Sequence, residues 1–138
     1  FADFFYIDTL STFQLSTSIN TSSSISFTNL TNLFNISNHA FSTSCVNNTT
    51  IFLYGGQMFD VDNSSSLVYF IDTGLGLWIK PKISGPSPGR RRNLMGVINN
   101  AGKIYLYGGI DENQNVMKDM FVLDTLLLIW ESEMNTTA

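Results

Sequence analysis

Apolar runs separated by polar, glycine-containing stretches dominate the chain, and no segment shows the periodicity of an amphipathic helix. The runs at Thr50–Tyr54 and Lys103–Tyr107 combine strand length with β-branched and aromatic residues, which favours strands covered on both faces. Each run is followed by two glycines, which permit backbone angles closed to other residues. Further strands are predicted at 2–10, 11–18, 39–46, 67–71, 77–83, 91–98, 119–123 and 127–132.

This strand pattern occurs twice at a nearly fixed spacing. The glycine pairs lie 53 residues apart, whereas Asp72 and Asp124, like Trp78 and Trp130, lie 52 residues apart. A partial copy opens the chain at 3–9. A fixed period of this size predicts a repeat architecture. A β-sandwich also contains many short strands, but it gives no reason for the matched spacing.

The repeated residues resemble the kelch repeat, a unit of about 50 residues that forms one blade of a β-propeller. The shared features are a glycine pair after an apolar strand, then an aromatic residue and a tryptophan. Phe121 stands where the family usually has tyrosine. The resemblance implies an all-β fold, a kelch-type β-propeller fragment with four-stranded antiparallel blades, in the superfamily that includes galactose oxidase. The matching residues are Gly55, Gly56, Tyr69, Asp72 and Trp78 in one copy, and Gly108, Gly109, Phe121, Asp124 and Trp130 in the other.

We therefore expect a partial β-propeller across 1–138, with about two and a half blades. A complete propeller usually has about 4–8 blades, so the remaining blades would come from missing parts of a longer chain. We also expect Trp78 to be buried by the next blade, against Ile104, Leu106 and Phe121, and Trp130 to be more exposed. The expected parts are a trailing half blade at 1–18, a Ser/Thr/Asn-rich loop at 19–38, blades at 39–83 and 91–134, and a connecting loop at 84–90.

The overall charge and the single cysteine restrict the possible partners. A net charge of −4 and an isoelectric point near 4.6 argue against a nucleic-acid partner. No apolar run is long enough to span a bilayer within this segment. Cys45 cannot form a disulfide within the chain, and we expect it to be a small buried apolar residue. A partner cysteine outside the segment stays an open alternative.

The only basic cluster is Arg90, Arg91 and Arg92, in a turn-rich connection. Since the guanidinium fork suits carboxylates and phosphates, these residues are candidates for binding a protein partner. The alternative, for all of the charged loop residues, is that they are ordinary residues of solvated turns. Asp60 and Asp62 have calcium-loop spacing but lack the glycine and the final acid of such a loop. The acidic partner-binding candidates, in loops of two successive copies, are Asp60, Asp62, Asp111 and Glu112.

Enzyme motifs are lacking from this segment, which predicts no catalytic, cofactor or metal site within it. The resemblance implies a kelch-repeat scaffold that binds a protein partner through its loop faces. The alternative is a secreted galactose-oxidase-like or carbohydrate-handling propeller whose active site lies outside the segment. Resemblance to such a copper oxidase would imply two histidines, two tyrosines and a cross-linked cysteine. Of these residue types, the segment contains one histidine, His39, and one cysteine, Cys45.

Asn-x-Ser/Thr sequences are frequent, and most lie in predicted loops that could carry a glycan. They slightly favour a secreted or cell-surface glycoprotein over a cytoplasmic protein. Biased composition is the alternative explanation. The candidate asparagines are Asn20, Asn29, Asn35, Asn47, Asn48, Asn63 and Asn135.

Overall fold

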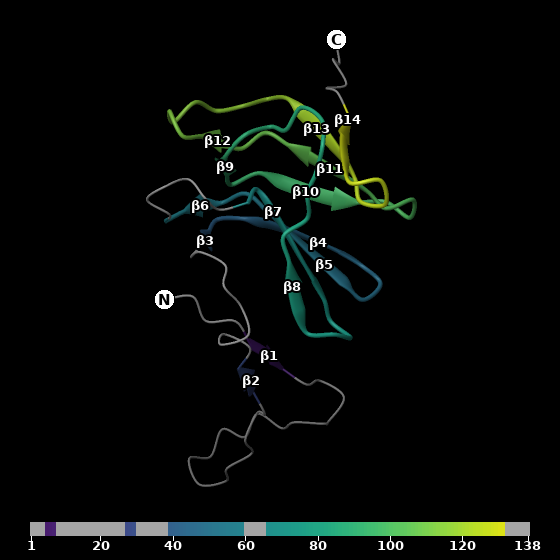
Figure 1. Cartoon of the computed structure of the whole chain (residues 1–138). Helices are drawn as coiled ribbons and strands as arrows, with labels where there is room; N and C mark the ends of the chain where they lie inside the picture. The colour runs from purple at the N-terminus through teal and green to yellow at the C-terminus, as the bar shows by residue number, and fades with distance from the viewer. Residues whose placement is uncertain (1–4, 8–26, 30–38, 60–65, 132–138) are drawn as a thin grey trace, which may run out of the picture. The chain divides into compact units, whose positions relative to one another are not determined.

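A computed structural model describes residues 5–7, 27–29, 39–59 and 66–131 of the chain (Figure 1). The chain divides into two compact units, Phe1–Asn35 and Ile36–Ala138. Every element in the described residues is a β-strand. The all-β prediction is therefore confirmed.

In the first unit, the described residues form a short antiparallel strand pair, β1 (Phe5–Ile7) and β2 (Phe27–Asn29), with Tyr6 opposite Thr28. The strand predicted at 2–10 is thus described only at its centre. Residues 27–29 form a strand although the sequence assigns 19–38 to a loop. Three residues are too few to show strand alternation, so only the pairing with β1 reveals them. The strand predicted at 11–18 lies outside the described residues.

The second unit is built around two four-stranded antiparallel sheets, each with strands in sequence order. Neighbouring strands are joined as a meander, so backbone donors and acceptors within each sheet pair with one another. The two sheets confirm the predicted kelch-type blades of four antiparallel strands. The first consists of β4 (Thr43–Asn47), β5 (Thr50–Tyr54), β7 (Val68–Asp72) and β8 (Leu77–Ile79). The second consists of β10 (Met95–Ile98), β11 (Lys103–Tyr107), β13 (Met120–Asp124) and β14 (Ile129–Glu131).

Two small antiparallel pairs extend these sheets on one side of the unit (Figure 1). The first pair is β3 (His39–Ala40) with β6 (Gln57–Met58). The second is β9 (Arg91–Arg92) with β12 (Ile110–Asp111).

The inner strands predicted at 39–46 and 91–98 are each broken in two. Phe41 and Asn93, at the breaks, have left-handed backbone angles, with φ of 60° and 57°. Asparagine tolerates this region better than most residues, whereas it is unusual for phenylalanine. The Asn93 amide donates a hydrogen bond of 2.9 Å to the Phe41 carbonyl, so the two breaks support one another.

The first glycine pair, Gly55 and Gly56, contacts the backbone of the segment that leads into the second sheet. Gly55 has a φ of +62°, and a Cβ atom there would lie 2.6 Å from the Arg91 carbonyl oxygen. The amide of Gly56 donates a 2.7 Å hydrogen bond to that same oxygen. The glycine pair therefore permits both a left-handed backbone and a backbone contact between successive repeats.

The repeated Asp-Thr pairs close the outer hairpins in the same way in both sheets. Asp72 Oδ1 accepts hydrogen bonds from the Gly74 and Leu75 amides, at 2.8 and 3.2 Å. Asp124 Oδ1 accepts from the amides of Leu126 and Leu127, both at 2.9 Å. Each aspartate is thus used to order the turn that follows its strand.

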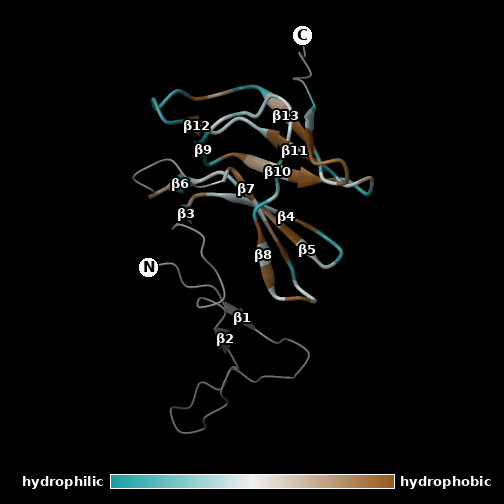
Figure 2. Ribbon diagram, viewed as in Figure 1, coloured by the Kyte–Doolittle hydropathy of each residue, from teal (hydrophilic) through white to brown (hydrophobic). Residues whose placement is uncertain are grey.

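The core lies between the two sheets, whose strands carry most of the apolar residues (Figure 2). The inner strands β4 and β10 pack against one another. At their contact a Cβ atom on Gly96 would lie 3.1 Å from the sulfur of Cys45, which is buried as predicted. Tyr54 of the first sheet meets Trp130 of the second edge to face, with ring centroids 5.6 Å apart. The tryptophan-bearing face of the second sheet therefore packs onto the first sheet.

The predicted order of tryptophan burial is wrong. Trp130 is only 4% exposed, whereas Trp78 is half-buried. Ile71, the strand partner of Trp78, shares its face, while Phe52 and Tyr54 lie on the opposite face of that sheet. Trp130 thus lies on the face of the second sheet that packs against the first sheet, whereas Trp78 lies on the face of the first sheet that is turned away from the second.

Replacing Gly55 by alanine should destabilise the second unit more than the same change at Gly76. Both glycines have similar positive φ angles, +62° and +66°, but no atom lies within 4 Å of a Cβ built at Gly76. Left-handed strain alone should cost about 1–2 kcal/mol at either site, and Gly55→Ala adds the displacement of the Arg91 carbonyl. Denaturant unfolding would measure both losses, and equal losses would show that the backbone contact is unimportant.

Candidate functional site

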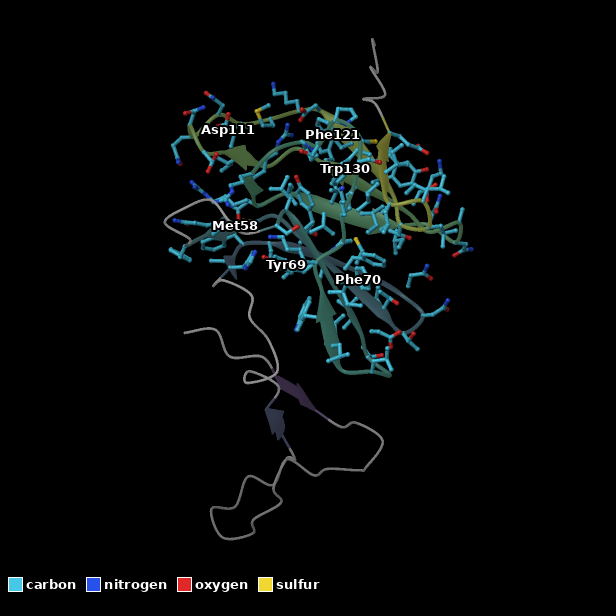
Figure 3. All side chains as sticks on the ribbon, viewed as in Figure 1. Met58, Tyr69, Phe70, Asp111, Phe121 and Trp130 are labelled. Atoms are coloured by element: carbon cyan, nitrogen blue, oxygen red, sulfur yellow. The ribbon has the colours of Figure 1, made fainter. Side chains whose placement is uncertain are left out.

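A pocket of about 230 Å³ lies on the side of the second unit that carries the two small strand pairs. Met58 of β6 and Asp111 of β12 lie on this side of the molecule (Figure 3). Both repeats therefore contribute to the pocket. Its lining residues are Gly56, Gln57, Met58, Arg90, Arg91, Arg92, Ile110, Asp111, Glu112 and Gln114.

Arg91 anchors the entry to the second sheet and is only 6% exposed. Its Nη2 donates to Asp119 Oδ2 at 2.8 Å, and its Nη1 donates to Asp119 Oδ1. Nε donates to the Pro88 carbonyl at 3.0 Å, and Nη1 to the Gly108 carbonyl at 3.2 Å. The guanidinium also lies 5.2 Å from the ring centroid of Phe121. Arg91 is thus committed to contacts within the chain, although its edge lines the pocket.

The ion pair shifts the titration of both partners. The hydrogen bond from Arg91 lowers the pKa of Asp119 below its ordinary value of 3.8 and outweighs the opposing effect of burial. The same hydrogen bond raises the pKa of Arg91. Both groups are therefore charged over the physiological range, and the pair is neutral as a whole.

Arg92 and Asp111 bring opposite charges to the pocket. In the antiparallel pair of β9 and β12, Arg92 lies opposite Ile110 and Asp111 lies opposite Arg91. The Arg92 guanidinium donates a 2.6 Å hydrogen bond to Gln114 Oε1. Asp111 accepts hydrogen bonds from the amide and side chain of Asn115, at 2.8 and 2.9 Å. The side-chain bond from Asn115 is the main cause that lowers the pKa of Asp111. The pocket thus presents an oriented cation and an oriented carboxylate.

Most of the predicted partner-binding residues meet at this pocket, but they differ in how far they face solvent. Arg90 and Arg92 are half-buried, and Glu112 is exposed. Asp60 and Asp62 lie outside the described residues. The sequence prediction missed Gln57, Met58 and Gln114, which lack charge. Only the pairing of β3 with β6 could have indicated that Gln57 and Met58 reach this side.

The predicted glycan acceptors are described at three positions only. Asn47 is half-buried at the end of β4, whereas Asn48 is exposed in the turn that follows, with a φ of 51°. Asn29 is the last residue of β2. Modification of these sites stays a prediction. The remaining candidates, Asn20, Asn35, Asn63 and Asn135, lie outside the described residues.

The described part of the chain contains no group of three or more His, Cys, Asp or Glu side chains that could hold a metal ion. His39 meets the ring of Tyr69 edge to face at 5.6 Å. Burial raises the pKa of the Cys45 thiol. In the same part of the chain, no helix is long and apolar enough to cross a membrane.

Asp119→Asn should flatten the loss of stability at acid pH. Because the folded-state pKa of Asp119 is lowered, its contribution is complete above pH 3.8 and is lost as the pH falls below that value. At neutral pH the variant should be less stable by about 1–3 kcal/mol, since Arg91 loses its charged partner.

Urea unfolding at several pH values would measure this difference, with Glu112→Gln as the control at an exposed pocket residue. The control should keep the acid-side decline of the unmodified chain. An undiminished decline in Asp119→Asn would contradict the anchoring role of the ion pair.

Comparison with known proteins agrees with the repeat. Kelch domain-containing protein 3 of Rattus norvegicus is 31% identical over 83 residues, which are 59% of this chain and 21% of that protein. The Homo sapiens and Bos taurus proteins of the same name are each 30% identical over the same length, with the same coverage. No family model matches the chain.

The chain thus spans about a fifth of the length of the curated relatives that it matches. Its two sheets have the same strand order, and Asp72 and Asp124, like Trp78 and Trp130, hold the same register positions in them. The sequence similarity and the repeated four-stranded sheets together support the resemblance to the kelch repeat that the sequence pattern indicates.

Proposed function

We propose that this chain is part of a protein-interaction scaffold, and that it binds a protein partner through the pocket between its two small strand pairs. The observation that carries the proposal is the meeting of Arg90, Arg92, Asp111 and Glu112 at one pocket of about 230 Å³. The kelch-domain relatives support an interaction role in general, which is a fold-level argument.

The chemistry of the pocket suits recognition of a polar, charged segment. Arg92 and Asp111 are each held by a neighbouring amide side chain, so less conformational freedom is lost when a partner binds. Arg91 supports the floor and is already neutralised by Asp119. We therefore assign partner contact to Arg90 and Arg92, and positioning to Arg91.

We further infer that another blade covers the outer face of the second sheet. Tyr54 of the first sheet is buried beneath Trp130, whereas its counterpart Tyr107 is 50% exposed. Met95 and Val97 extend this apolar face and are 72% and 59% exposed. Since the second sheet covers the corresponding face of the first, a third repeat is the natural cover for this one.

The partner proposal is tested by replacing Arg90 and Arg92 together with alanine. A photo-reactive amino acid at Glu112 would first capture partners in cells, with the same group at Asn100, in the hairpin before Lys103, as the control position. The affinity of the identified partner should then fall by about tenfold in the double variant, since charged hydrogen bonds are lost.

Lys118→Ala, at another exposed cation, is the matched control and should bind normally. The melting transition should barely move, because surface changes usually alter stability by about 0.5 kcal/mol or less. Equal affinities for the double variant and the unmodified chain would refute the proposed contact.

A further inference from the structure

A second, larger groove of about 450 Å³ lies away from the pocket described above. It is formed where the start of β7, the segment that follows β8 and the outer strand β14 meet. No residue lines both sites. The groove residues are Ser66, Leu67, Val68, Lys80, Pro81, Lys82, Ile83, Ser87 and Trp130.

The floor of this groove is apolar and continuous with the core. Leu67 and Ile83 pack against the core cluster, and Val68 belongs to it. Trp130 also lines the groove, and its ring packs edge to face against Tyr54 in the core. A side chain entering the groove would therefore meet apolar atoms that are already fixed in position.

One wall of the groove is held by backbone hydrogen bonds to β14. The Ser84 amide donates to the Leu128 carbonyl at 3.1 Å, and the Trp130 amide donates to the Ser84 carbonyl at 2.8 Å. A Cβ atom on Gly85 would lie 2.5 Å from the Trp130 carbonyl oxygen, so the two backbones run close together. The segment that follows β8 is therefore joined to the outer strand by an isolated β-bridge between Ser84 and Ile129.

The rim of the same wall is basic. Lys80 and Lys82 flank Pro81, and both lysines are exposed, whereas Pro81 and Ile83 are half-buried. Alternating exposure of this kind is expected of an extended backbone, which proline favours both at its own position and at the one before it. Two cations therefore share the solvent side of a segment whose other side lines an apolar groove.

We propose that this groove binds an acidic segment of a protein partner, with an apolar side chain of that segment entering the groove. Charge complementarity identifies the occupant, because the two lysines form a local basic rim on a chain with a net charge of −4. The volume lies within the range of about 300–1,000 Å³ found for small-ligand sites, so it admits one or two side chains. This site goes beyond the proposed function, since it is distinct from the arginine pocket.

The probes are short acetylated and amidated peptides, each with two adjacent leucines or phenylalanines flanked by glutamates. Matched peptides carry lysines in place of the glutamates. In the Trp78→Phe variant, fluorescence reports Trp130 alone, and its emission should shift when an acidic peptide binds. Titration at low salt gives the affinity, which should weaken as salt is raised.

Lys80→Glu combined with Lys82→Glu should weaken acidic-peptide binding by about tenfold or more and should create binding of the lysine peptides. Lys118→Glu is the control for overall charge and should have little effect. Arg90→Ala combined with Arg92→Ala should also leave this binding unchanged, which separates the groove from the arginine pocket.

Three results would overturn the proposal. One is the absence of a Trp130 response to every acidic peptide at millimolar concentration. Another is equal binding of acidic and lysine peptides by the unmodified chain. The third is an equal loss of binding in Lys118→Glu and the double lysine variant, which would indicate a general charge effect.

Discussion

The packing of Trp130 against Tyr54 is the contact on which the rest of the second unit depends. It joins the outer strand of one sheet to a central strand of the other, which are distant in sequence. Truncation of an aromatic residue buried in this way typically costs about 3–5 kcal/mol. The same tyrosine reaches beyond the ring contact, because its hydroxyl donates a 2.8 Å hydrogen bond to the Gly89 carbonyl. Tyr54 thereby fixes the connection that leads to the arginine pocket.

The two repeats use the same positions with different chemistry. In the second repeat, Arg91 lies over the ring of Phe121 and is neutralised by Asp119. In the first, the strand pairing places His39 at the position of Arg91, where it meets Tyr69, the counterpart of Phe121. In the first repeat, the position that corresponds to Asp119 holds the apolar residue Leu67. The same position in the two repeats thus accepts either an arginine or a histidine beside the aromatic ring.

The fold could be predicted from sequence because its strongest constraints are local. Runs such as Lys103–Tyr107 specify strands by composition, and the glycine pairs and Asp-Thr pairs mark where those strands end. The spacing of these marks then identifies successive blades. By contrast, the backbone breaks at Phe41 and Asn93 depend on a hydrogen bond between repeats, which no local pattern reveals.

The candidate site was only partly predictable for the same reason. A charge cluster identifies the arginines, but their separate roles depend on distant residues. Arg91 is anchored by Asp119, whereas Arg92 meets Gln114 at the rim. The predicted order of tryptophan burial was wrong, because equal spacing in the sequence does not show which face of a sheet packs against the neighbouring sheet. The groove beside Trp130 combines segments from three parts of the chain and carries no sequence motif.

The most direct test of this arrangement is a double-mutant cycle between Tyr54→Leu and Trp130→Leu, measured by denaturant unfolding. If the sheets pack as described, the two losses should be coupled by about 0.5–1.5 kcal/mol, the usual range for an aromatic pair. A second cycle, between Tyr54→Leu and Trp78→Leu, should show additivity, since these side chains lie on opposite faces of one sheet. Additive losses for Tyr54 and Trp130, or stronger coupling of Tyr54 to Trp78, would contradict the packing of the two blades.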